Sequence, residues 1–218
     1  MYRYRIHYHK LDAIKYTSNL DLYKVWERSC RRAGLPLVYS QGFHPQPKIN
    51  LACPLPLGIT STVEIVDIWL SALFDLETIV DMLENAVPPG IKVQNVELVA
   101  TSEPAIQTTI LAARYQAIFP VAFDSNRLAM NINSVMEQVA IVRLRRNRQY
   151  DLRPLILGLS LLQTPECMEG IEMLLSAREG KTGRPDEVLL QLGIDPSLAD
   201  ITRVELIRAE LIRNQTGG

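Results

Sequence analysis

The sequence predicts an α+β fold, and three observations lead to this prediction. The chain has 218 residues and is 47% hydrophobic, which is enough for two small cores. The same order of strand and helix patterns occurs twice, and the segment TSEPAIQ separates the two occurrences. We therefore expect two tandem ferredoxin-like domains of the βαββαβ type, at residues 1–100 and 108–218, joined by a linker at 101–107.

The first half begins with a strand and a capped helix. Residues 2–9 alternate between hydrophobic and basic side chains, which predicts a half-buried strand with a basic outer face. Ser18, followed three residues later by Asp21, predicts the start of a helix that Gly34 ends. The remaining patterns predict strands near 37–41, 48–53 and 63–71, a helix at 76–87 and a strand at 92–99.

The second half repeats this order. Its patterns predict a strand at 111–121, a helix at 124–138, strands near 139–146, 151–161 and 169–177, a helix at 185–192 and a last strand at 201–212. The repeat lies in the order of elements, because the two halves share no visible sequence similarity.

Composition indicates a cytoplasmic globular protein. No hydrophobic run approaches a membrane span, and the alternating start MYRYRIHYHK lacks the apolar region of a signal peptide. The three cysteines, Cys30, Cys53 and Cys167, are odd in number and far apart, so neither a disulfide framework nor a metal knuckle is indicated. We expect buried free thiols.

The net charge of −1 hides a segregation of charge along the chain. Residues 3–32 hold eight basic and three acidic side chains, whereas residues 60–105 hold eight acidic ones and a single lysine. A second basic zone, VRLRRNRQYDLR, follows at 142–153. If the fold joins the two basic zones, they make a face for an anionic partner. The alternative is two solvated faces that never meet.

The stretch YSQGFHPQPK at 39–48 predicts a rigid loop between two strands. Gly42 permits an unusual backbone conformation, and Pro45 and Pro47 force the residues before them into extended geometry. In such a loop Phe43 is placed to stack on a base and Lys48 to meet a phosphate. The alternative is a structural hairpin in which Phe43 fills the core and the prolines protect a sheet edge.

Two further segments carry basic residues in turns. A hairpin that turns at Asn147 crowds several arginines together, and phosphates relieve such repulsion. The segment Arg178–Pro185 contains Gly180-Lys181-Thr182, which matches the end of a phosphate-binding loop motif. The first glycine of that motif is replaced by Leu175, so only a basic turn into a helix remains.

Histidine chemistry has no clear support in the sequence. His7 and His9 share one strand face but lack further ligands, so we expect no metal site. His44 is the remaining histidine, and no sequence pattern indicates a partner residue that would let it act as a general acid or base. A hydrogen-bonding or structural role is expected for it.

Five segments spread over the chain form a specific combination: SNLDL at 18–22, RRAGLPLVYSQGFHPQPKI at 31–49, PLPLG at 54–58, DLRPLI at 151–156 and GRPDEVL at 183–189. In this combination the sequence resembles the radical-SAM-associated (radical-SAM-linked) family of bacterial proteins of uncharacterised function. The resemblance implies a role beside an RNA-directed radical-SAM enzyme. The chain lacks CxxxCxxC, so the iron–sulfur cluster and S-adenosylmethionine are expected in the partner, with no cofactor in this chain. Asn19 stands where the family often has histidine, which disfavours shared histidine catalysis.

We therefore expect a non-enzymatic RNA-binding module that presents RNA, such as tRNA or rRNA, to a radical-SAM protein, without membrane or DNA contact. One alternative is a metal-independent endoribonuclease on the same scaffold, and another is a protein-interaction adaptor that uses the acidic 60–105 region. The residues expected to contact nucleic acid are Arg28, Arg31, Gln41, Gly42, Phe43, His44, Lys48, Arg145, Arg146, Arg148, Lys181 and Arg184.

Overall fold

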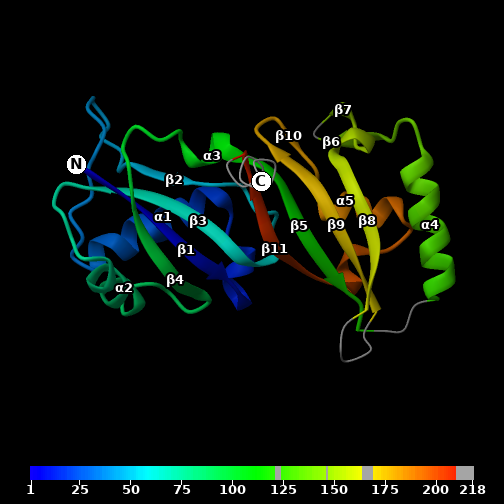
Figure 1. Ribbon diagram of the computed structural model, residues 1–218, viewed down its shortest axis with the longest axis horizontal. Helices are drawn as coiled ribbons and strands as arrows, with labels where there is room; N and C mark the ends of the chain where they lie inside the picture. The colour runs from blue at the N-terminus through cyan, green and yellow to red at the C-terminus, as the bar shows by residue number, and fades with distance from the viewer. Residues whose placement is uncertain (121–123, 146, 164–168, 210–218) are drawn as a thin grey trace, which may run out of the picture. The chain divides into compact units, whose positions relative to one another are not determined.

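Strands and helices alternate along the chain in the computed structural model, which describes residues 1–120, 124–145, 147–163 and 169–209 (Figure 1). These residues form five α-helices and a set of mostly antiparallel strands, so the predicted α+β class is confirmed. The chain divides into two compact units, Met1–Ile110 and Leu111–Gly218.

The first unit contains one four-stranded antiparallel sheet and two long helices. Its elements are β1 (Tyr2–Lys10), a 3-10 helix η1 (Asp12–Tyr16), α1 (Asn19–Arg32), β2 (Ile49–Leu51), β3 (Thr60–Leu70), α2 (Leu76–Glu84), β4 (Ile91–Val99) and the single turn α3 (Ile106–Thr109). Within this unit β3 pairs with β2 and β1, and β1 pairs with β4, so the strand order is β2-β3-β1-β4.

Local signals set the ends of α1. The Ser18 hydroxyl accepts a hydrogen bond from the Asp21 backbone N–H at 3.2 Å, as an N-cap residue does. Gly34 follows the helix with a φ of 72°, a conformation that favours glycine at a helix end. Between these signals Leu22, Trp26 and Cys30 recur every four residues and are buried.

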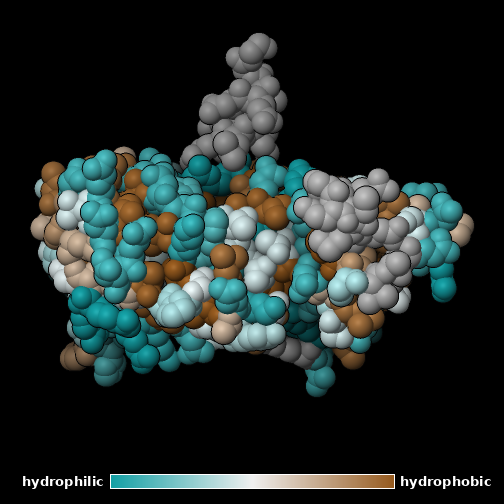
Figure 2. Space-filling model, turned by 90° about the horizontal axis from the view of Figure 1, so that it is seen from below, coloured by the Kyte–Doolittle hydropathy of each residue, from teal (hydrophilic) through white to brown (hydrophobic). Residues whose placement is uncertain are grey.

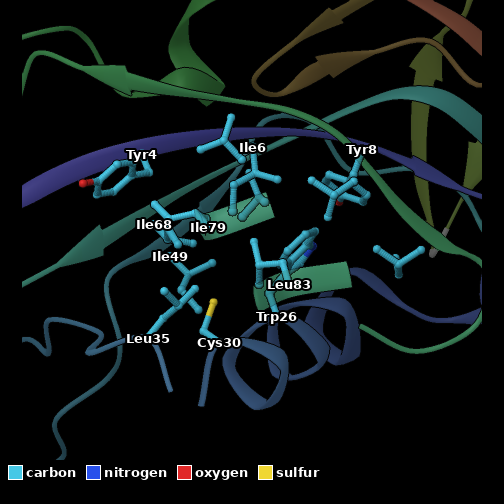
Figure 3. Packing of buried hydrophobic residues seen from close by; sticks show 14 of the residues in the cluster. Tyr4, Ile6, Tyr8, Trp26, Cys30, Leu35, Ile49, Ile68, Ile79 and Leu83 are labelled. Atoms are coloured by element: carbon cyan, nitrogen blue, oxygen red, sulfur yellow. The ribbon is translucent and has the colours of Figure 1, made fainter. Parts of the chain in front are cut away.

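The core of the first unit lies between one face of the sheet and the two helices. Tyr4, Ile6 and Tyr8 of β1 point toward the helices, where Trp26 of α1 and Leu83 of α2 meet them (Figure 3). The rings of Tyr8 and Trp26 lie edge to face, with centroids 4.8 Å apart. Burial of this one face fixes the direction of every side chain in β1.

The opposite face of β1 is not the basic outer surface that the alternation predicts; that interpretation was wrong. Arg3 and Arg5 are only 1% and 4% exposed. Both bind the buried carboxylate of Asp67 on β3: Arg3 Nη2 lies 2.6 Å from Oδ2, and Arg5 Nε lies 2.9 Å from Oδ1. Burial lowers the pKa of Arg5, but the hydrogen bond and charge of Asp67, together with the charges of Glu97 and Glu103, more than offset this, so the net pKa is raised.

Residues 101–107, predicted as a linker, lie within the first unit. Arg3 donates from Nη1 to the Glu103 carbonyl oxygen and from Nη2 to that of Pro104, both at 2.8 Å. Ile106 at the start of α3 is fully buried. The segment is therefore attached to the sheet through the same arginine that binds Asp67.

The second unit has the elements β5 (Ile110–Ile118), α4 (Ser125–Glu137), β6 (Val142–Arg145), β7 (Arg148–Asp151), a 3-10 helix η2 (Arg153–Leu155), β8 (Ile156–Gln163), β9 (Glu169–Arg178), β10 (Lys181–Thr182), α5 (Pro185–Gln191), a 3-10 helix η3 (Pro196–Leu198) and β11 (Asp200–Arg208). In its sheet β5 lies between β9 and β11, while β8 pairs with β9. The hairpin β6–β7 forms a separate two-stranded sheet.

The predicted strand at 37–41 is replaced by two isolated bridges. Leu37 pairs with Leu70, and Tyr39 pairs with Pro47. Because proline has no N–H to donate, Pro47 cannot support a continuous ladder, and regular pairing begins only at Ile49.

On the face of the molecule drawn in Figure 2, hydrophilic and hydrophobic residues are interspersed. Among the described residues, no helix has the length and hydrophobicity that crossing a membrane requires.

Replacing Asp67 by asparagine should destabilise the protein strongly. Asp67→Asn removes the buried carboxylate that both arginines bind and leaves Arg5 only the more distant Glu97 and Glu103, at 3.9 and 3.8 Å. We expect a loss of about 3 to 5 kcal/mol in the free energy of unfolding, measured by urea titration. Asp81→Asn on the exposed side of α2 is the control and should change stability by less than about 0.5 kcal/mol. Equal effects of the two substitutions would contradict the assigned role of Asp67.

Candidate functional site

The stretch singled out in the sequence forms a closed hairpin loop, residues Ser40–Gln46, between α1 and β2. It projects from the sheet of the first unit (Figure 1). The Ser40 N–H donates to the Gln46 carbonyl oxygen at 2.8 Å, and the Gln46 N–H donates to the Ser40 hydroxyl at 3.0 Å. Below them the Lys48 N–H donates to the Val38 carbonyl oxygen at 2.7 Å. These bonds fix both ends of the loop.

Two neighbours hold the base of the loop. The Val38 N–H donates to the Trp69 carbonyl oxygen of β3 at 2.7 Å. From α1 the Tyr23 hydroxyl donates to the carbonyl oxygen of buried Pro47 at 2.5 Å. Burial, and then the charges of Glu27 and Tyr39, raise the pKa of Tyr23, so its hydroxyl stays protonated and able to donate. Tyr23 was not among the residues predicted for this site.

The tip of the loop is exposed. Phe43 is 102% exposed, which excludes the alternative in which its ring fills the core. Gln41 and His44 are exposed on either side of it. Gly42 has a φ of 143°, in the region where side chains are strained, although a Cβ there would meet no atom within 4 Å. The backbone conformation, and not lack of space, thus favours glycine at position 42.

The basic residues near this loop differ in their availability. On α1, Lys24 lies 3.7 Å from Asp21, and Arg31 lies 2.7 Å from Glu27, so both charges are partly neutralised. Arg28 is exposed and has no ion pair within the described residues. Lys48 is exposed, and among the residues that the structure describes its ammonium group contacts only the sulfur of Met1, at 3.8 Å.

In the second unit the basic hairpin is divided between structural and exposed arginines. Arg153 donates to the carbonyl oxygens of Met136 and Gln138 at the end of α4, and Arg143 donates to that of Glu187. Arg145 and Arg148 face each other across β6–β7 and are exposed. Asn147 has a φ of 60° at the predicted turn, and Arg146 lies outside the described residues.

The turn from β9 into α5 contains the last two predicted residues. Lys181 in β10 is exposed. Arg184 is half-buried and pairs with Asp186 at 2.6 Å, so its charge is already compensated. Lys181 therefore remains available to a ligand, whereas Arg184 is held by its neighbour.

Titratable groups form no evident catalytic arrangement in the described part of the chain. His7 lies 3.2 Å from Glu97, and burial together with the charge of Lys92 lowers the pKa of His9. Burial raises the pKa of Cys30 to about 12, which makes it a poor nucleophile. Among the described residues, no three His, Cys, Asp or Glu side chains are grouped to hold a metal ion.

The second unit also contains a cavity of about 700 Å³ that the sequence did not predict. Its lining comes from five separate segments between Leu111 and Ile207, so no local motif signals it. Of the predicted residues that the structure describes, Lys181 is the one that lines it.

Together, fold and site define an α+β protein whose most distinctive surface is an exposed aromatic loop with basic neighbours. The chain belongs to the family described as "Uncharacterized protein conserved in bacteria (DUF2344)", whose model matches residues 3–185.

Comparison with solved structures gives a likeness in outline. A chain of the structure described as "Crystal Structure of a Cbf5-Nop10-Gar1 Complex" matches with a TM-score of 0.49 and 9% sequence identity. The match covers 93% of the present chain and 48% of the other, so the present chain spans about half of that protein's length. No curated protein matches the sequence.

Removing the Tyr23 hydroxyl should loosen the base of the loop. Tyr23→Phe deletes the hydrogen bond to Pro47, and such a bond stabilises the folded state by about 1 kcal/mol. Hydrogen exchange at the Ser40 and Lys48 amides should therefore accelerate about fivefold. Tyr16→Phe, at a well-exposed tyrosine, is the control and should leave both rates unchanged. Unchanged exchange in Tyr23→Phe would show that α1 does not hold the loop.

The Cys30 thiol should resist alkylation in the folded protein. With a pKa of about 12, roughly one thiol in ten thousand is ionised at pH 8, so iodoacetamide should leave Cys30 unmodified. The same treatment in urea should modify it fully, as measured by mass spectrometry of the Cys30 peptide. Rapid native modification would contradict the burial of this residue.

Proposed function

We propose that this protein is a non-enzymatic RNA-binding module that recognises a substrate RNA for a radical-SAM enzyme. The observation that carries the proposal is Phe43, a fully exposed ring at the tip of the Ser40–Gln46 loop. The loop is closed by its own backbone and held by Tyr23, so little conformational entropy remains to be lost on binding. An unpaired base of RNA offers a flat face on which such a ring stacks.

The charges around Phe43 support an anionic partner. Lys48 follows the loop directly, and Arg28 is exposed on α1, the helix that holds the base of the loop. In single-stranded nucleic acid, phosphates lie beside the bases, so an aromatic ring and nearby cations act together. Arg145, Arg148 and Lys181 give the second unit its own exposed cations.

Each unit is proposed to be a ferredoxin-like domain. In the first unit the order β1-α1-β2-β3-α2-β4 combines with the strand order β2-β3-β1-β4, and all neighbours are antiparallel. In the second unit β8, β9, β5 and β11 take the corresponding places, with α4 and α5 as the helices. The hairpin β6–β7 is then an insertion between helix and strand.

The radical-SAM partner is proposed from the sequence resemblance of the segments at 18–22, 31–49, 54–58, 151–156 and 183–189. Four of these segments contain or adjoin the residues described above. The second spans the whole Ser40–Gln46 loop, the first begins α1, the fourth contains Arg153, and the last opens α5.

Truncating Phe43 should weaken RNA binding without weakening the fold. With a fluorescent single-stranded RNA, Phe43→Ala should lower affinity about 5- to 150-fold in anisotropy titrations, the range for one lost stacking contact. Phe43→Trp should retain affinity, because it restores the flat ring. Leu73→Ala, at an exposed aliphatic residue in the same unit, is the control.

The same titrations distinguish the other functions. Absence of RNA binding at low salt, or equal loss in Phe43→Ala and Leu73→Ala, would overturn the proposal. If RNA is cut in the presence of a chelator and His44→Ala stops the cutting, the protein is an endoribonuclease instead.

Removing the two hairpin arginines should change the salt dependence of binding. If Arg145 and Arg148 each meet a phosphate, the double substitution Arg145→Gln, Arg148→Gln should reduce the slope of log affinity against log salt by about 0.7 per contact. Arg127→Gln on α4 is the control, with an unchanged slope expected. An unchanged slope in the double variant would remove the hairpin from the interface.

A further inference from the structure

The cavity of the second unit has a hydrophobic floor. Ala112 of β5 and Leu174 of β9 line it, and Leu155 and Leu157 form a wall at the start of β8. Ala112 pairs with Ser176 across β5–β9, so the floor lies on one sheet face. At about 700 Å³ the cavity is within the usual range for small-molecule sites, about 300 to 1,000 Å³.

The charged groups of the cavity are concentrated at the β9–β10 turn. Arg178 and Lys181 line it there, are exposed, and form no ion pair within the described residues. Asp151 is the one carboxylate among the described residues of the lining; it is exposed, and its Oδ1 accepts from the N–H groups of Ile141 at 2.8 Å and Arg153 at 3.0 Å. The described lining therefore has an excess of one positive charge.

Few uncommitted polar side chains remain in the lining. The Ser176 hydroxyl donates to the Lys181 carbonyl oxygen at 2.6 Å. The Tyr150 hydroxyl is buried and has no hydrogen-bond partner among the described residues. A ligand with many polar groups, such as a nucleobase, would lose hydrogen bonds to water that this lining cannot replace.

We propose that this cavity binds an amphiphilic anion, a molecule with an aliphatic body and a single carboxylate or phosphate head. The body lies on the floor of Ala112 and Leu174, and the head meets Arg178 and Lys181. The proposal does not depend on RNA binding, because it concerns a different ligand and shares only Lys181 with the residues proposed to contact RNA.

Calorimetric titration of the full chain tests the proposal with defined probes. Decanoate and decyl phosphate represent the two head groups, decanol lacks the charge, and guanosine monophosphate carries a phosphate on a polar body. We expect one molecule of decanoate or decyl phosphate to bind, and decanol to bind at least tenfold more weakly. Octanoate should bind more weakly than decanoate by about fourfold for each missing methylene, which corresponds to the free energy of burying one such group. The stronger of the two anions identifies the head group.

Variants of the lining connect binding to this cavity. Leu157→Trp adds bulk to the wall and should abolish decanoate binding, whereas Leu161→Trp, four residues further along β8 and outside the lining, should not. Both leucines are partly exposed, at 49% and 41%, so both variants are expected to fold. Arg178→Gln with Lys181→Gln should weaken decanoate at least tenfold and leave decanol unchanged.

The inference is overturned if decanoate and decanol bind equally, if neither anion binds, or if guanosine monophosphate binds in their place. Equal binding by Leu157→Trp and Leu161→Trp would overturn it as well. Urea titration of each variant separates loss of the site from loss of the fold.

Discussion

The carboxylate of Asp67 is the constraint on which the first unit depends. It sits fully buried on β3 and receives four N–H donors from Arg3 and Arg5, one directly opposite on β1 and one diagonal to it. A one-residue slip of β1 would turn both arginines into the hydrophobic core and leave Asp67 unpaired. The buried charges thus specify the register of β1 against β3, whether or not they add to the stability of the fold. Arg3 also donates to the carbonyl oxygens of Glu103 and Pro104, which attaches that segment to the same strand.

The register of β3 also sets the position of the exposed loop. Trp69 stands two residues after Asp67, and its backbone bonds to Val38 on one side of the loop and to Lys48 on the other. Tyr23 adds a third attachment from α1. These attachments present Phe43, which is fully exposed, at the tip of a loop whose base is fixed. The position of that base thus depends on the register that the buried charge pairing sets two residues away on β3.

Local signals in the sequence predicted most of the helices and strands, although the strand expected at 37–41 is replaced by isolated bridges. They did not predict what surrounds each element. Ser18, Gly34 and Asn147 each mark a boundary that depends on a few neighbouring residues, and the structure has those boundaries. The alternation of residues in β1 correctly predicted a strand with two different faces. It does not indicate which part of the protein covers the face that carries Arg3 and Arg5. The counter-charge for Arg3 and Arg5 lies more than sixty residues away, on Asp67. The hydrogen bond from Tyr23 to Pro47 also joins residues far apart in the sequence, and so do the contacts that line the cavity. The ion pair of Arg31 with Glu27 is local and could have been predicted from the sequence, but it was overlooked.

Lys181 links the two proposed activities within the second unit. It belongs to the exposed cations that suit a phosphate backbone, and it also lines the cavity with Arg178. An anionic head group bound there would neutralise part of the charge that RNA contact requires in this unit. Because coupling between two ligands is reciprocal, RNA bound at Lys181 would lower the affinity for the amphiphilic anion by the same factor. The stacking contact proposed for Phe43 belongs to the other unit and involves neither cation, so competition would act on the electrostatic part of the proposed RNA binding and leave the aromatic part intact.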